Sequence, residues 1–159
     1  MSGQKDIKAK NIKIISVNRR ANFNYSILDT YEAGIVLTGG EVKSLRDGKV
    51  NIGDSFGRVE GDEIFLFNMH INPYFFDMHK DIDPLRTRKL LFHRQEITRL
   101  MGKMAQQGLT LVPLKIYFKS GKVKVELGLG KGKKAHDKRE TLKKKAADME
   151  VDRTMKGRR

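Results

Sequence analysis

The amino-acid sequence predicts a mainly β fold with flanking helices, built as a closed antiparallel barrel and followed by a basic tail. Short segments rich in β-branched and aromatic residues recur along the chain, separated by glycine-containing turns, whereas one long segment has helical periodicity. Apolar residues become sparse after Gly130. Closing a sheet of many short strands into a barrel removes its exposed edges.

Composition narrows the class of protein. The 159 residues suffice for one domain with an appendage, and a net charge of +14 indicates a polyanionic partner. The chain has no cysteine, which excludes disulfides and thiolate metal sites and favours a reducing compartment, so we expect a cytoplasmic protein. No apolar run reaches the ~18 residues of a membrane span, and the first residues lack the apolar core of a signal peptide.

The N-terminal part of the chain is predicted to hold three strands. Residues 1–11 are polar and are expected to be flexible. Residues 12–17 have strand composition, and residues 23–31 alternate apolar with polar side chains. A polar break or a turn of helix, residues 18–21, separates these two strands. Residues 33–37 are small and apolar, as in a buried strand.

A short helix is expected next, because Thr38 and Glu41 have the spacing of a capping box around a Gly39-Gly40 turn. Asp47-Gly48 would end this helix. We expect it to turn two side chains inward and three toward water: Val42 and Leu45 inward, and Lys43, Ser44 and Arg46 outward. Its polar face is therefore cationic.

Further strands follow in the middle of the chain. Residues 50–60 are strand-like but contain two glycines, which suggests a bulge or a bend. Residues 60–62 have hairpin-turn composition, and residues 64–71, the most apolar run, predict a central strand. Residues 90–92 are compatible with another short strand.

The strongest helix signal lies in residues 94–107, where apolar residues recur at i, i+3, i+4 and i+7 and Gly108 follows as a stop signal. Residues 110–119 and 122–130 then predict a hairpin through Ser120-Gly121. Residues 12–130 together have the size and strand content of an oligonucleotide-binding barrel.

The tail, residues 131–159, differs in composition from the barrel. It holds twelve Lys and Arg against five Asp and Glu, which is +7 of the total charge. Its few apolar residues cannot bury enough surface for independent folding, although residues 140–152 are good helix formers. We expect the tail to be disordered when free and helical when it lies against a polyanion.

The sequence offers little for catalysis. The four histidines have no metal-ligand spacing and no cysteine partner, and His70 is interpreted as a core residue of its strand. Residues 128–134 contain glycines and lysines but lack the spacing of a phosphate-binding loop. No nucleophile-and-base arrangement is visible. We therefore expect a protein that is not an enzyme, with no cofactor and no metal.

Three basic clusters are candidates for contact with phosphates: Lys43/Arg46/Lys49, Arg86/Arg88/Lys89, and the tail. For the first two, a solvated surface is an equally good explanation. The aromatic run of residues 74–76 could stack on unpaired bases, but we interpret it as core or loop anchors. His136 lies between tail lysines and could stack on a base, or it could be a bystander.

An ordered set of motifs carries a family resemblance. The set comprises N-R at 18–19 followed by Ala21, E-A-G-I at 32–35, E-V-K-S-L-R at 41–46, D-S-F at 54–56, D-P-x-R-x-R-K-L-L at 83–91, T-L-V-P-L-K-I-Y at 110–117 and K-G-K-K-x-H-D-K-R at 131–139. Each motif alone is weak, but the ordered set is specific. The chain resembles the small protein B family, the SsrA-binding (tmRNA-binding) proteins of bacterial trans-translation. Residues 140–159 match only in basic, helix-favouring character.

The resemblance implies an oligonucleotide-binding barrel that binds the tRNA-like domain of tmRNA. It also implies entry into stalled ribosomes, with elongation factor Tu delivering the alanyl-tmRNA. The tail would follow the empty mRNA channel along 16S rRNA as a helix. Positions that match those used for tmRNA binding are Asn18, Glu32, Leu91 and Lys124, and Arg19, Lys43 and Arg46 are cationic neighbours included with them. Positions that match the tail segment acting in the decoding centre are Lys131, Lys133, Lys134, His136, Asp137, Lys138 and Arg139.

Two other classes of function compete with this RNA-binding adaptor. A structural ribosomal protein with a basic extension would also explain the tail, and it would stay with ribosomal subunits through high salt. A nucleic-acid-processing enzyme is disfavoured because the strands carry neither a metal cluster nor paired carboxylates.

Overall fold

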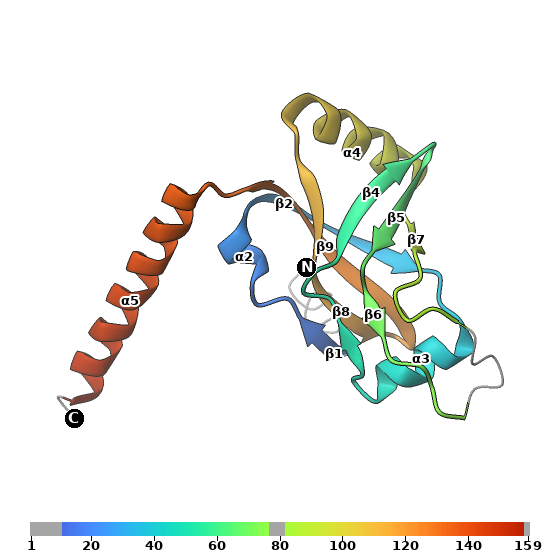
Figure 1. Ribbon diagram of the computed structural model, residues 1–159, viewed down its shortest axis with the longest axis horizontal. Coiled ribbons are helices and arrows are strands. Elements are labelled where there is room, and N and C mark those ends of the chain that lie inside the picture. Colours follow the sequence, from blue (N-terminus) through green and yellow to red (C-terminus); the bar gives the residue numbers. More distant parts are fainter. Residues whose placement is uncertain (1–10, 77–81, 158–159) are drawn as a thin grey trace, which may run out of the picture.

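The computed structural model describes residues 11–76 and 82–157 (Figure 1). The strands are β1 (Ile12–Val17), β2 (Tyr25–Ile35), β3 (Val50–Asn51), β4 (Phe56–Glu60), β5 (Glu63–Phe67), β6 (His70–Ile71), β7 (Arg88–Leu91), β8 (Thr110–Lys119) and β9 (Lys122–Gly132). The helices are α2 (Ala21–Asn24), α3 (Gly39–Arg46), α4 (Arg94–Gln107) and α5 (Ala135–Gly157). Figure 1 shows α3 and α4 at opposite ends of the strand assembly, with α5 projecting away from it.

The strands form a closed antiparallel ring. The sheet order is β1-β8-β4-β5-β7-β2-β9, and an additional pairing of β8 with β9 joins its two sides. β1 and β4 pair with different parts of the long β8 strand, so β1 is an attachment to the ring. β3 and β6 form a separate two-stranded sheet. The predicted mainly β fold with flanking helices is thus confirmed.

The core fills the inside of this ring. Inward-facing side chains from β5, β8 and β9 are completely buried, among them Ile64, Leu66, Ile116, Val125 and Leu127. Leu45 of α3 and Leu100 of α4 join the same core. Burying one such side chain contributes roughly 1.5–3 kcal/mol, so these contacts hold both helices on the barrel.

Several local predictions are confirmed. α4 spans residues 94–107 and ends at Gly108, which has the left-handed backbone (φ 61°) that favours glycine. The β8–β9 hairpin has the expected turn, and Thr38 and Glu41 form both hydrogen bonds of the capping box of α3. At the Gly57 bend, a Cβ atom would lie 2.8 Å from Cδ2 of Leu111, so a side chain there would block the close approach of β4 to β8.

Strand boundaries in the first half differ from the prediction. Phe23 and Asn24 are helical, because their amides bond to the Arg20 carbonyl. The two strands predicted at 23–31 and 33–37 are one strand, β2, which pairs with β9 from Tyr25 to Gly34. The central strand predicted at 64–71 is divided into β5 and β6 because Asn68 has a positive φ of 62°. The 50–60 segment is likewise divided, into β3 and β4.

Three side-chain predictions are wrong. Ser44 does not face water: it is 1% exposed and its hydroxyl donates to the Asn72 carbonyl at 2.6 Å. The Arg86/Arg88/Lys89 cluster is not a free cationic surface, because Arg88 is fully buried and each of the three cations pairs with a glutamate. The interpretation of Phe75 and Phe76 as core anchors is wrong, since they are 79% and 77% exposed, whereas their interpretation as loop anchors stays a prediction. The interpretation of His70 as a core residue also changes, because it is only half-buried.

The tail forms the helix α5, which buries none of its residues. Residues just before and within the first turns of α5 nevertheless contact the barrel domain. The Lys133 amide donates to the Asn24 carbonyl at 2.9 Å, and the Lys133 ammonium donates to the Asn22 carbonyl and the Thr141 hydroxyl, each at 2.8 Å. The ammonium of Lys138 lies 5.8 Å from the centre of the Phe23 ring. The predicted flexible N-terminus lies outside the described residues except for Asn11.

Candidate nucleic-acid interface

A row of paired residues crosses the outer face of the barrel. The strand registers place Leu91 of β7 opposite Gly34 of β2, Gly34 opposite Lys124 of β9, and Lys124 opposite Tyr117 of β8. We call these four residues the barrel row. The absence of a side chain at Gly34 leaves space beside Leu91, because a Cβ atom at Gly34 would lie 3.3 Å from Cβ of Leu91. Leu91 is 50% exposed, so the row offers both an apolar contact and a cation.

Glu32 lies one outward position before Gly34 on β2, at the edge of the barrel row. Its carboxylate accepts a hydrogen bond from the Tyr117 hydroxyl and two from the Lys119 ammonium, the latter at 2.9 and 3.0 Å. Its side chain is still 37% exposed. We call Glu32, Tyr117 and Lys119 the acidic brace, because two neighbouring side chains fix the direction of one exposed carboxylate.

The electrostatics keep this carboxylate ionised. Burial alone would raise the pKa of Glu32, but the hydrogen bonds from Tyr117 and Lys119 and the charges of Lys119 and Lys124 outweigh it and lower the pKa. Burial, together with the bond to Glu32, raises the pKa of Tyr117, so its hydroxyl remains a donor. Glu32 is therefore a fixed hydrogen-bond acceptor in a cationic surrounding.

The other barrel residues predicted to bind RNA lie outside the row. Asn18 is 8% exposed, and its side-chain amide donates to the Pro113 carbonyl at 3.0 Å, so it mainly holds the end of β1 against β8. Arg19 follows it and is exposed. Lys43 and Arg46 are exposed on α3, and the Lys43 ammonium lies 5.3 Å from the centre of the Tyr74 ring.

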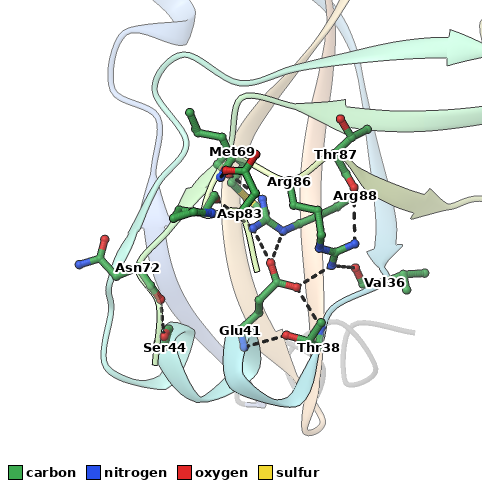
Figure 2. Close-up of polar contacts among 12 residues, drawn as sticks. Val36, Thr38, Glu41, Ser44, Met69, Asn72, Asp83, Arg86, Thr87 and Arg88 are labelled. Carbon is green, nitrogen blue, oxygen red and sulfur yellow. Dashed lines mark hydrogen bonds and ion pairs between the residues drawn. The ribbon is translucent and has the colours of Figure 1, made fainter. Parts of the chain in front are cut away.

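α3 is fixed to the barrel by a buried ion network (Figure 2). Glu41, the capping-box residue, is 6% exposed and pairs with Arg86 at 2.6 Å and with the fully buried Arg88. Arg88 also donates to the carbonyls of Met69, at 2.6 Å, and Pro84, at 3.1 Å. Glu41 and Arg88 are thus paired inside the protein, where they position α3, and Arg86 pairs with Glu41 from the partly exposed edge of the network.

The candidate tail residues divide into tied and free side chains. Lys133 and Lys138 contact the α2 region as described above. Lys131, Lys134, His136, Asp137 and Arg139 are exposed. The carbonyl of Asp137 accepts from the Thr141 hydroxyl at 2.9 Å, a bond within the first turns of α5. The tail therefore begins with a partly anchored, strongly basic segment and continues as the exposed helix α5, which carries seven Lys and Arg against five Asp and Glu.

Comparison with known proteins identifies the family. The model of the SmpB protein family matches residues 15–157. The chain belongs to the SmpB protein family. SsrA-binding proteins are similar to it: that of Anoxybacillus flavithermus is 56% identical over 146 residues, covering 92% of this chain and 95% of the relative. That of Thermosynechococcus vestitus is 55% identical over 148 residues, covering 92% and 97%.

A solved chain from the structure "tmRNA-SmpB: a journey to the center of the bacterial ribosome" is 57% identical, with a TM-score of 0.63, over 76% of this chain and 85% of that one. This membership agrees with the predicted resemblance to small protein B.

Sequence reasoning missed two members of the acidic brace, Tyr117 and Lys119. The signal was available, since inward Ile116 and Phe118 imply by strand alternation that Tyr117 and Lys119 face outward with Lys124.

Across the described ranges, residues 11–76 and 82–157, no three His, Asp or Glu side chains gather closely enough to hold a metal ion. None of the helices described is long and apolar enough to cross a membrane.

Proposed function

We propose that this chain is a non-enzymatic, cytoplasmic adaptor that binds the tRNA-like domain of tmRNA and brings it to stalled ribosomes for trans-translation. One observation carries the proposal. A member of the SmpB family combines the barrel row and acidic brace on its barrel with an exposed basic tail that ends in the helix α5. Its similarity to SsrA-binding proteins over 92% of its length supports the same assignment.

The barrel face has the chemistry that RNA recognition requires. Lys124 and the neighbouring Lys119 supply cations for phosphates, and Leu91 supplies an apolar contact for a ribose or base. The exposed oxygen surface of Glu32 accepts a hydrogen bond from a ribose 2′-hydroxyl or a base amine, and the first of these contacts distinguishes RNA from DNA. Because Asn18 is mostly internal, its part in binding is to hold β1 in place beside Arg19.

The tail supplies a second, separate contact. Its exposed cations, Lys131, Lys134 and Arg139, with His136 nearby, form no ion pair with another described residue and suit rRNA phosphates in the decoding centre. The following turns of α5 suit the anionic mRNA channel when it is empty. Ordering a free tail there costs on the order of 1–2 kcal/mol per residue, which contacts with 16S rRNA offset. Elongation factor Tu takes part only through the alanyl-tmRNA.

Truncation tests this division of function. The cut belongs after Lys134, because β9 pairs with β2 as far as Gly132 and Lys133 bonds to Asn22 and Asn24. The truncated protein is expected to bind the tRNA-like domain of tmRNA with nearly unchanged affinity and to lose peptide tagging on stalled ribosomes. Gel shifts with ordinary tRNA as competitor and a tagging assay measure the two effects. A truncation that abolishes RNA binding contradicts the division.

A further inference from the structure

We infer that Glu126 is a second hydrogen-bond acceptor for RNA on the barrel face, next to Glu32. The inference rests on the proposed function for the identity of the partner. It adds a specificity-determining residue to the barrel row and the acidic brace, neither of which includes Glu126. The group that Glu126 would recognise is a hydrogen-bond donor of the RNA, either a ribose 2′-hydroxyl or a base amine.

The strand registers place Glu126 beside the residues already described. Glu126 of β9 lies opposite Glu32 of β2 on one side and opposite Lys115 of β8 on the other. We call these three residues the acceptor row. Glu126 is also one outward position from Lys124 on β9, so the acceptor row lies next to the barrel row, about 7 Å along the strand. Backbone pairing thus makes the two rows parts of one face.

The carboxylate of Glu126 is paired but not removed from solvent. It lies 3.6 Å from the Lys115 ammonium, and the side chains of Lys115 and Glu126 are 37% and 31% exposed. The same ammonium lies 6.0 Å from the centre of the Tyr117 ring. Glu32 is held separately, by Tyr117 and Lys119. Each carboxylate therefore has its own lysine from β8, and each side chain stays partly exposed.

Folding stability does not account for two carboxylates in this arrangement. Like charges directly opposite each other on neighbouring strands are destabilising. The exposed ion pair of Lys115 with Glu126 contributes little, because water screens it. A second carboxylate also repels phosphate, so it does not serve phosphate binding. Accepting hydrogen bonds from RNA donors is a role that fits both the exposure and the charge of Glu126.

Charge changes sign along the outward positions of β9. Lys122 and Lys124 lie toward the β8–β9 turn, and Glu126 follows them. Beyond Glu126 the polar surface ends, because Ile27 packs over Gly128, where a Cβ atom would lie 3.0 Å from Cδ1 of Ile27. Phosphates are attracted to the lysines on the side of the turn and repelled from the acceptor row. The riboses or bases of the same RNA then lie over the acceptor row.

The direction of the change in affinity tests the inference. If the face only attracted phosphates, Glu126→Lys would strengthen binding, because it adds a cation. We expect the opposite: Glu126→Lys should weaken affinity for the tRNA-like domain of tmRNA about ten-fold to a hundred-fold, the range for loss of one hydrogen bond to a charged group. Asp29→Lys is the matched control, because Asp29 also pairs with a lysine but lies opposite Leu129, outside the acceptor row. It should not weaken binding.

Modified probes identify the donor. One set of tRNA-like domains carries 2′-deoxyriboses, introduced segment by segment, and a second set carries base analogues that lack the exocyclic amine. Each probe is titrated with the full chain and with Glu126→Ala, which makes a double-mutant cycle. If the donor is a 2′-hydroxyl, one deoxy segment should weaken binding to the full chain but not to Glu126→Ala. If the donor is an amine, one analogue should do the same.

Three results would overturn the inference. These are unchanged or stronger binding of Glu126→Lys, an equal loss with Asp29→Lys, and additive effects of Glu126→Ala with every modified probe. Glu126→Gln keeps one acceptor oxygen, so it should lose less affinity than Glu126→Lys, with the unfolding transition of the full chain. A loss of affinity in Glu126→Gln that follows only from unfolding also contradicts the inference. Failure of the full chain to bind the unmodified domain contradicts the proposed function instead.

Discussion

Two glutamates nine positions apart show how the same pairing chemistry serves different purposes. Glu32 and Glu41 each accept hydrogen bonds from two basic or hydroxyl-bearing side chains that are distant in the chain. Glu41 is 6% exposed and Arg88 is not exposed at all, whereas Glu32 and Lys119 are 37% and 27% exposed. The difference in solvent access makes Glu41 part of the scaffold and leaves Glu32 able to meet a ligand.

Burial changes what each pair contributes. Removing one partner of a buried pair leaves an uncompensated charge inside the protein, which is costly, whereas exposed pairs contribute little to stability because water screens them. The comparison therefore predicts opposite responses: substitutions at Glu41 should change folding, and substitutions at Glu32 should change binding.

The largest effect is expected for Glu41→Ala. It leaves Arg88 buried without a counter-charge and also removes one bond of the capping box, so the free energy of unfolding should fall by about 3–5 kcal/mol. Urea or thermal unfolding measures this change. Glu96→Ala is the matched control, because Glu96 holds the same capping-box position in α4 but pairs with no described buried arginine. The control should cost only about 1 kcal/mol. Equal losses at both positions would show that the buried ion network adds nothing.

Acid should reveal the same network. Burial would raise the pKa of Glu41, but the Thr38 amide and both guanidinium groups outweigh it and hold the pKa below its ordinary value of 4.5. A carboxylate with a lowered pKa contributes stability above that ordinary value, and the contribution is lost as the pH falls toward and through the folded-state pKa. Stability of the full chain should therefore decline below about pH 4.5 more steeply than that of Glu41→Ala.

A smaller effect, on binding and not on folding, is expected for Glu32→Ala. Loss of one charge-assisted hydrogen bond, about 1.5–3 kcal/mol, should weaken affinity for the tRNA-like domain about ten-fold to a hundred-fold. Stability should change by less than ~1 kcal/mol. Asp29→Ala is the control, because Asp29 also pairs with an exposed lysine, Lys103 at 3.1 Å, but lies opposite Leu129 and not opposite a residue of the barrel row. An unchanged gel shift with a lower melting temperature would assign Glu32 to the scaffold.

Structural features whose residues are close together in the chain could be predicted from the sequence, whereas pairings between distant residues could not. The capping box, α4 with Gly108, and the β8–β9 hairpin depend on residues close together in the chain, and all were predicted. The pairing of Glu41 with Arg88 spans 47 positions, so the sequence showed Arg88 only as a positive charge and its burial was missed. For Phe75 and Phe76 the error was the reverse, since aromatic composition suggested burial that the fold does not provide.

The candidate site was predictable to a different degree. Glu32, Leu91 and Lys124 were predicted through the family resemblance, but their arrangement in and beside the barrel row depends on strand registers that no local pattern specifies. Tyr117 and Lys119 could have been predicted to face outward by alternation alone. Their hydrogen bonds to Glu32 join residues more than 80 positions apart, so these bonds could not be predicted from the sequence.

The smallest effect is expected for Thr38→Ala, which separates the local part of the Glu41 site from its ion network. The Thr38 hydroxyl accepts from the Glu41 amide at 3.2 Å, and this bond is independent of Arg86 and Arg88. Its loss should cost about 1 kcal/mol, and Thr38→Ser should retain most of the stability, because serine caps a helix equally well. The steep decline in acid should remain, since the Thr38 backbone amide and the guanidinium groups still bind the carboxylate. If Thr38→Ala instead removed that decline, the capping geometry, and not the buried charges, would be what orients Glu41.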